Sequence, residues 1–145
     1  MHRRPLGRGR QVAGLAAIAI VIGCFLPWWE VGGGVGQVPA VRGNGFEGSG
    51  IVVFFSALAT IALLALPYAA ADRPSSIDRP LSFVIVLLAG WLGFAARLVD
   101  LGLSFQLGTF IGAILPSKAP GLWIAALGLI VLSRAVYDLS RERRI

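Results

Sequence analysis

The chain has 145 residues, a formal net charge of +6, 57% hydrophobic residues and only 14% charged residues. Soluble domains carry about 25% charged residues, so this composition excludes an ordinary soluble domain and indicates a membrane protein. The chain has one Cys and one His, and His2 precedes the first apolar run. These counts exclude an intramolecular disulfide and a thiolate or imidazole metal centre within the apolar segments, and we expect no cofactor.

Four stretches of the sequence are long and apolar enough to cross a bilayer as helices. They cover residues 12–29, 51–71, 81–99 and 122–139, each close to the ~20 residues that a transmembrane helix requires. Formal charges inside these ranges are confined to Arg97 in the third and to Arg134 and Asp138 in the fourth. We therefore predict an all-α, multi-pass membrane protein in which residues 1–145 form a single membrane domain.

Tryptophan residues mark the ends of two predicted spans. Trp28 and Trp29 close the first span, and Trp123 lies near the start of the fourth. Indole rings favour the headgroup level, where the ring can lie in apolar surroundings while its N–H is hydrated. We therefore expect Trp28, Trp29 and Trp123 to be interfacial anchors.

The connections after the first and third spans are long. Residues 30–50 are rich in glycine, which favours turns or a short hairpin, with residues 37–41 as its strand-like piece. Residues 102–117 carry no charge, but their three glycines and one proline weaken a membrane-crossing helix. We expect a short helix there, lying in the outer interface or packed over the bundle between the third and fourth spans.

The basic residues predict the orientation, because cytoplasmic loops carry an excess of Lys and Arg. With a cytoplasmic N-terminus, four spans place ten basic residues inside and three outside. The inside set is Arg3, Arg4, Arg8, Arg10, Arg73, Arg79, Arg134, Arg141, Arg143 and Arg144, and the outside set is Arg42, Arg97 and Lys118. We therefore predict that both termini are cytoplasmic. A fifth crossing would put the two basic ends on opposite sides.

Small residues recur four positions apart in every predicted span. Examples are Ala19 and Gly23 in the first span and Gly121 and Ala125 in the fourth. Such pairs let helix backbones approach closely, which favours association in lipid. Together with the short loop between the second and third spans, they predict an antiparallel bundle of four transmembrane helices. We interpret these pairs as internal packing, with intermolecular contact as the alternative.

Val21-Ile22-Gly23-Cys24 resembles a bacterial lipobox, in which the Cys is lipidated and becomes the mature N-terminus. The Arg-rich lead and the apolar run before it fit a signal peptide. However, the apolar run continues to Trp29, where a lipoprotein normally turns polar. We interpret Cys24 as a residue packed in the first helix, and lipidation stays open as the alternative.

Arg97 and Asp100 are three residues apart, so they can meet on one helical face. A charge at the bilayer centre costs ~2.5 to 3.5 kcal/mol and indicates function by default. These two residues lie near the outer end of the third span, where Arg97 can reach headgroups or pair with Asp100, Glu30 or Glu47. We predict a structural ion pair of Arg97 and Asp100 rather than a transport or proton-relay site.

No motif of catalysis or metal binding occurs in the sequence. It lacks a phosphate-binding glycine loop, a nucleophile elbow and paired carboxylates within a span, so we expect no enzyme and no catalytic residues. The basic residues cluster at the two ends of the chain, beside apolar spans. This placement favours contact with anionic lipids, and we expect no nucleic acid partner.

Short motifs in the first span, in the loop before the second and at the start of the fourth carry a resemblance. They are Gly23-Cys24-Phe25-Leu26-Pro27-Trp28 at the end of the first span, Gly43-Asn44-Gly45 and Gly48-Ser49-Gly50 before the second, and Gly121-Leu122-Trp123 with Gly128 in the fourth. In these motifs the chain resembles small four-helix membrane proteins of actinobacteria and chloroflexi, mostly of unassigned function. The resemblance implies a multi-pass protein of a bacterial cytoplasmic (inner) membrane and carries no activity. The segment 102–117 is longer than the loop it implies.

The leading hypothesis is a non-catalytic accessory or scaffolding subunit of a larger membrane complex, whose partners are other integral membrane proteins. It follows from the small size, the missing cofactor ligands and the apolar segment 102–117. The alternative is a small oligomeric transporter or channel, for which Ser56, Thr60 and Ser82 are the polar residues near mid-span. A sensor or lipid-binding module built on the two outer loops is a third hypothesis.

Overall fold

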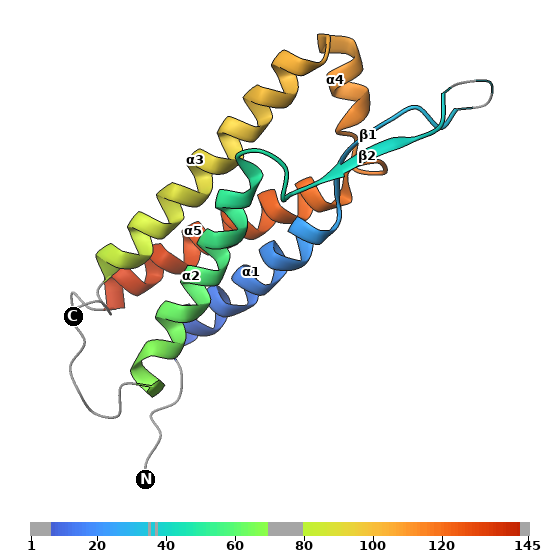
Figure 1. Cartoon of the computed structure of the whole chain (residues 1–145). Helices are drawn as coiled ribbons and strands as arrows, with labels where there is room; N and C mark the ends of the chain where they lie inside the picture. The colour runs from blue at the N-terminus through green and yellow to red at the C-terminus, as the bar shows by residue number, and fades with distance from the viewer. Residues whose placement is uncertain (1–6, 35, 37, 70–79, 143–145) are drawn as a thin grey trace.

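The computed structural model describes residues 7–34, 36, 38–69 and 80–142. In this part of the chain four helices are long and apolar enough, by length and composition, to cross a membrane. They are α1 (Arg8–Phe25), α2 (Gly50–Ala69), α3 (Pro80–Ser104) and α5 (Pro120–Glu142). The strands β1 (Pro27–Val31) and β2 (Val41–Asn44) lie between α1 and α2, and the short helix α4 (Leu107–Ala113) connects α3 to α5 (Figure 1).

The first helix ends at Phe25, four residues before the predicted end of the first span. Pro27 disfavours helical geometry at the residue before it, and Leu26 is accordingly extended. The chain then enters β1, which pairs antiparallel with β2. The prediction that a continuous helix reaches residue 29 is therefore wrong, because Trp28 and Trp29 belong to a strand. The predicted strand-like piece 37–41 overlaps β2 only at its last residue.

The hairpin caps the end of α1, where helix carbonyls lack partners within the helix. The indole N–H of Trp28 donates to the carbonyl oxygen of Gly23 at 3.0 Å. The backbone N–H of Gly45 donates to the carbonyl oxygen of Cys24, also at 3.0 Å. The sheet is therefore fixed to the helix that precedes it.

Helix α1 packs against α5 through glycines at both ends. Near the start of α1, a Cβ on Gly9 would lie 3.3 Å from Leu139, close to the end of α5. Near the end of α1, a Cβ on Gly23 would lie 2.9 Å from the carbonyl oxygen of Gly121, at the start of α5. The two helices therefore run in opposite directions.

Helix α2 packs between α1 and α3. Gly14 of α1 faces Leu64 of α2, and a Cβ on Gly93 of α3 would lie 2.7 Å from the Cβ of Val52. Small residues therefore stand where the backbones approach most closely, as in helix association within lipid. We call the end of the molecule that carries β1 and β2 the sheet end, and the end where α1 begins and α5 ends the opposite end (Figure 1).

Three polar side chains within the helices, those of Thr60, Trp91 and Ser133, find partners inside the molecule. Thr60 is 2% exposed and its hydroxyl donates to the carbonyl oxygen of Ser56 at 2.9 Å. The indole N–H of Trp91 in α3 donates to the hydroxyl of Ser133 in α5, also at 2.9 Å. Ser133 in turn donates to the carbonyl oxygen of Leu129. These bonds offset the cost of placing polar atoms in an apolar interior.

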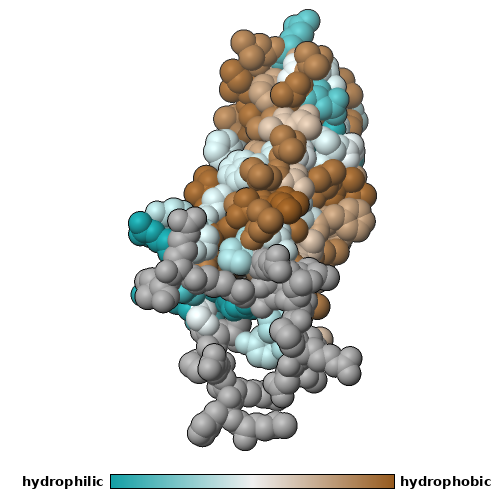
Figure 2. Space-filling view, turned by 90° about the vertical axis from the view of Figure 1, so that its left-hand side faces the viewer, coloured by the Kyte–Doolittle hydropathy of each residue, from teal (hydrophilic) through white to brown (hydrophobic). Residues whose placement is uncertain are grey.

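The outer surfaces of the long helices are apolar. Large exposed side chains occur on each of them, among them Leu15 of α1, Phe55 of α2, Leu92 of α3 and Leu127 of α5. Figure 2 shows apolar residues over much of one face. Soluble monomers rarely expose apolar surface on this scale, whereas lipid-facing helices do.

Helix α3 is longer than the predicted third span, which ends at residue 99. Gly93 lies beside the first turn of α2, and α3 continues to Ser104. At 1.5 Å per residue these eleven residues extend about 16 Å beyond the start of α2. The chain then turns back through α4, a helix of seven residues, within the segment where a short helix was expected.

Candidate functional site

A polar cluster joins the sheet to α3 at the sheet end. It consists of Trp29, Glu47, Arg97 and Asp100, and we call it the Arg97 cluster. The Nη1 atom of Arg97 donates to Oδ2 of Asp100 at 2.7 Å, and its Nη2 atom donates to Oε2 of Glu47 at 3.0 Å. The indole N–H of Trp29 donates to the same glutamate oxygen at 3.1 Å. The structure therefore brings Arg97 and Asp100 together and adds Glu47, while Glu30 stays in β1, paired by register with Arg42.

Burial is distributed unequally within the cluster. The side chain of Arg97 is 8% exposed, whereas those of Glu47 and Asp100 are 46% and 59% exposed. The guanidinium thus lies beneath two carboxylates that face outward. Its Nε atom is buried and has no hydrogen-bond partner among the described residues. Because a buried charge is costly unless it is paired, the two carboxylates are what allow arginine to occupy this position.

Two glycines make room for the cluster. A Cβ on Gly43 would overlap the indole nitrogen of Trp29 and the Glu47 carboxylate. Gly48 has φ of +55°, and a Cβ there would lie 3.1 Å from Nη1 of Arg97. Left-handed backbone favours glycine because it has no Cβ. The glycine-rich segment thus serves to bring Glu47 onto Arg97.

The side chains of the Arg97 cluster are engaged with one another, which suits them to a mechanical role. Together they tie β1, the loop before α2, and α3 into one unit. The described residues hold no group of three His, Cys, Asp or Glu side chains that could bind a metal ion. The arrangement therefore fixes the sheet on the helices.

The three tryptophans expected as anchors lie in different surroundings. Trp28 is 0% exposed, packs against Phe94 with ring centroids 5.6 Å apart, and donates inward to Gly23. It cannot reach lipid headgroups, so this expectation is wrong for Trp28, because the hairpin folds its ring into the core. Trp29 is half-buried within the Arg97 cluster. Trp123 is 43% exposed and donates to the carbonyl oxygen of Ile114.

Cys24 is completely buried in the last turn of α1. Its neighbour Gly23 packs against α5. The Cα atom of Cys24 itself would lie 2.9 Å from a Cβ on Gly45. The thiol therefore belongs to the core that joins α1 to the hairpin. Close packing in this core is a sufficient reason for a small, apolar side chain such as cysteine at position 24.

Sequence reasoning did not identify the bond between Trp91 and Ser133, which links α3 to α5. A signal was present, because a polar atom within an apolar span must find a partner inside the protein. The choice of partner depends on helix packing, since the two residues are forty-two positions apart. Ser56 and Thr60, named above as polar residues near mid-span, are both buried, and the Thr60 hydroxyl donates to the Ser56 carbonyl oxygen within α2.

Comparison with protein-family models, with characterised proteins and with solved structures found no match to this chain. The resemblance to four-helix proteins of actinobacteria and chloroflexi therefore stays a prediction from short motifs.

Proposed function

We propose that the chain is a non-catalytic accessory or scaffolding subunit of a larger membrane complex. In this proposal α1, α2, α3 and α5 form an antiparallel transmembrane bundle in a bacterial cytoplasmic membrane. Both termini are cytoplasmic, and α4 lies on the outer side of the membrane. The observation that carries the proposal is an exposed apolar surface on α3 and α4 that stands outside the bilayer in this placement.

The length of α1 supports the placement. Its 18 residues span about 27 Å at 1.5 Å per residue, close to the ~30 Å thickness of a bilayer's hydrocarbon core. With Arg8 at the cytoplasmic headgroups, Phe25 lies near the outer boundary. The ring of Phe54 in α2 lies 6.1 Å from that of Phe25, and Gly93 of α3 lies beside Val52. The hydrocarbon core therefore ends near Gly93 on α3.

In this placement the Arg97 cluster lies at the level of the outer headgroups. Arg97 is one helical turn beyond Gly93, about 6 Å, and headgroup layers are roughly 5 to 8 Å thick. A buried arginine covered by two half-exposed carboxylates suits this polar layer. The cluster thus holds the outer elements in place without a charge in the hydrocarbon core.

Beyond the cluster, α3 and α4 expose large aliphatic side chains. We call Val99, Leu103, Leu107 and Ile111 the outer ledge, and these residues are between 55% and 83% exposed. Leu103 is ten residues beyond Gly93, about 15 Å along the helix, so lipid tails do not reach it. An apolar surface in water is favourably covered by protein. The partner is therefore an integral membrane protein with an apolar extracytoplasmic patch.

Copurification after mild detergent extraction tests the proposal with matched variants. Leu103→Ala with Leu107→Ala removes the most exposed part of the outer ledge. Leu88→Ala with Leu92→Ala removes equally large, exposed side chains from the span of α3. We expect the wild type and the span variant to retain the same partner, and the ledge variant to lose it.

A monodisperse monomer with no stoichiometric partner would overturn the proposal. A photo-crosslinker at position 103 that joins only copies of this chain would overturn it too and would favour the small oligomeric transporter or channel. Solute flux in proteoliposomes of the purified chain would then decide that alternative.

A further inference from the structure

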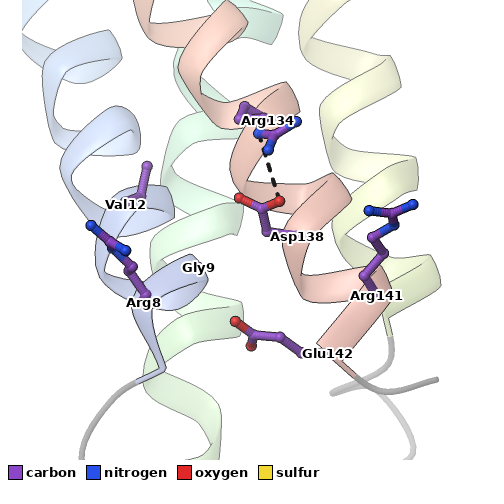
Figure 3. A pocket seen from close by; sticks show the side chains of 7 residues that line it. All are labelled: Arg8, Gly9, Val12, Arg134, Asp138, Arg141 and Glu142. Atoms are coloured by element: carbon purple, nitrogen blue, oxygen red, sulfur yellow. Dashed lines mark ion pairs between the residues drawn. The ribbon is translucent and has the colours of Figure 1, made fainter. Parts of the chain in front are cut away.

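A cavity of about 470 Å³ opens between α1 and α5 at the opposite end of the molecule. Three residues of α1 and four of α5 line it, and five of these side chains are charged (Figure 3). Arg8 lines the cavity from α1, and Arg134 and Arg141 line it from α5. In Figure 3 the guanidinium groups of Arg8 and Arg141 lie on opposite sides of the two helices. Asp138 and Glu142 are the two acidic side chains.

The arginines of this cavity are only partly neutralised. Arg134 pairs with Asp138 through its Nε atom at 3.6 Å, with 73% of its side chain exposed. Among the described residues, Arg8 and Arg141 have no carboxylate within ion-pair distance, and Arg141 lies over the ring of Tyr137 at 5.0 Å. The lining carries a net charge of +1, three arginines against two carboxylates. The positive dipole end of α1 and the negative dipole end of α5 both lie here. Their contributions oppose each other, so the charged side chains decide the sign of the electrostatic potential in the cavity.

Apolar side chains continue from the cavity along the same two helices. Val12 lines the cavity itself. Leu15 lies one turn further along α1, and Val131 and Leu127 lie one and two turns beyond Arg134 on α5. All three are exposed. A cationic site with an apolar strip beside it matches a molecule with an anionic head and hydrocarbon tails.

We propose that this cavity binds the phosphodiester headgroup of an anionic phospholipid of the cytoplasmic leaflet. Arg8 and Arg141 stand on opposite helices, and their long side chains turn toward the bound headgroup to donate charge-assisted hydrogen bonds to its phosphate oxygens. The acyl chains lie along Leu15, Val131 and Leu127. The bound lipid thereby joins the first and last spans at the level where they leave the membrane. This inference rests on the proposed membrane placement and is independent of the proposed partner.

Binding and thermal unfolding of the purified chain in neutral detergent test the site. The probes are phosphatidylglycerol, phosphatidylcholine with the same acyl chains, and inorganic phosphate. We expect phosphatidylglycerol to raise the unfolding temperature more than phosphatidylcholine does, and inorganic phosphate to leave it unchanged. The difference should shrink with added salt, which screens charge. Native mass spectrometry of the same samples counts bound lipids and stays informative when a variant is less stable.

The matched variants each remove two positive charges. Arg8→Gln with Arg141→Gln changes the cavity, and Arg42→Gln with Lys118→Gln changes the sheet end. We expect roughly fivefold weaker phosphatidylglycerol binding for each cavity arginine removed, and unchanged binding for the control. Equal binding by both double variants would overturn the site. If inorganic phosphate alone raised the unfolding temperature as much as phosphatidylglycerol does, the lipid assignment would be overturned. The ligand of the cavity would then be a soluble anion. Neither result depends on copurification of a protein partner.

Discussion

Arg97 and Glu47 are fifty positions apart in sequence, yet their side chains meet at 3.0 Å. The contact connects the last third of α3 to the loop that follows the hairpin, and Trp29 of β1 donates to the same carboxylate oxygen. Glu47 therefore accepts hydrogen bonds from β1 and from α3 at the same oxygen atom. This makes Glu47, rather than Asp100, the residue whose side chain links β1 to α3.

We expect Glu47→Ala to destabilise the protein by about 1 to 3 kcal/mol, because it leaves buried donors of Arg97 without an acceptor. Glu47→Gln should cost less, since its amide oxygen can still accept from Arg97 and Trp29. Asp100→Asn serves as the comparison, because Asp100 is the more exposed partner and an exposed pair contributes only ~0 to 1 kcal/mol. Thermal unfolding in detergent measures all three. A larger loss from Asp100→Asn than from Glu47→Ala would refute this order.

The sequence predicts the four apolar helices because their signal is local: each is a long run with few charges. The ion pair of Arg97 and Asp100 is equally local, since the spacing within one helix is known in advance. The positions of Trp28 and Glu47 are not local. Both depend on a hairpin that closes over the end of α1, and the glycine-rich segment that forms it carries little strand signal. A helix continued to the end of the apolar run therefore places Trp28 at the membrane surface, whereas the hairpin folds it into the core.

Gly121→Ala should destabilise the bundle by about 1 to 3 kcal/mol, the usual cost of overpacking. A Cβ at this position would overlap the carbonyl oxygen of Gly23 and lie 2.6 Å from that of Leu26. Backbone atoms cannot rotate away, so α1 and α5 must separate. Gly102→Ala is the control, because nothing lies within 4 Å of its Cβ position in α3, and alanine there should be neutral or stabilising. Equal unfolding temperatures for the two variants would show that the close approach of α1 and α5 is absent.

Cys24 should resist maleimide labelling in the folded protein and react after denaturation, because its side chain is completely buried. The intact mass of the purified chain should include the residues before Cys24, and Cys24→Ser should change that mass only by the substitution. A chain that begins at Cys24 and carries added acyl mass would instead support the lipobox. The structure would then lose α1, and α5 would lose the helix against which Gly121 packs.

Fusion reporters should place both termini on the cytoplasmic side. The start of α1 and the end of α5 lie together, since Gly9 packs beside Leu139, and ten of the thirteen basic residues fall on that side in a four-span topology. A periplasmic phosphatase fused after Ile145 should be inactive, and the same enzyme inserted after Gly34 should be active. A fluorescent protein that folds only in the cytoplasm should give the reverse pattern at these two positions. An active phosphatase at Ile145 would require an odd number of crossings. The segment containing α4 would then have to cross the membrane, and the apolar side chains of the outer ledge would face lipid instead of a partner protein.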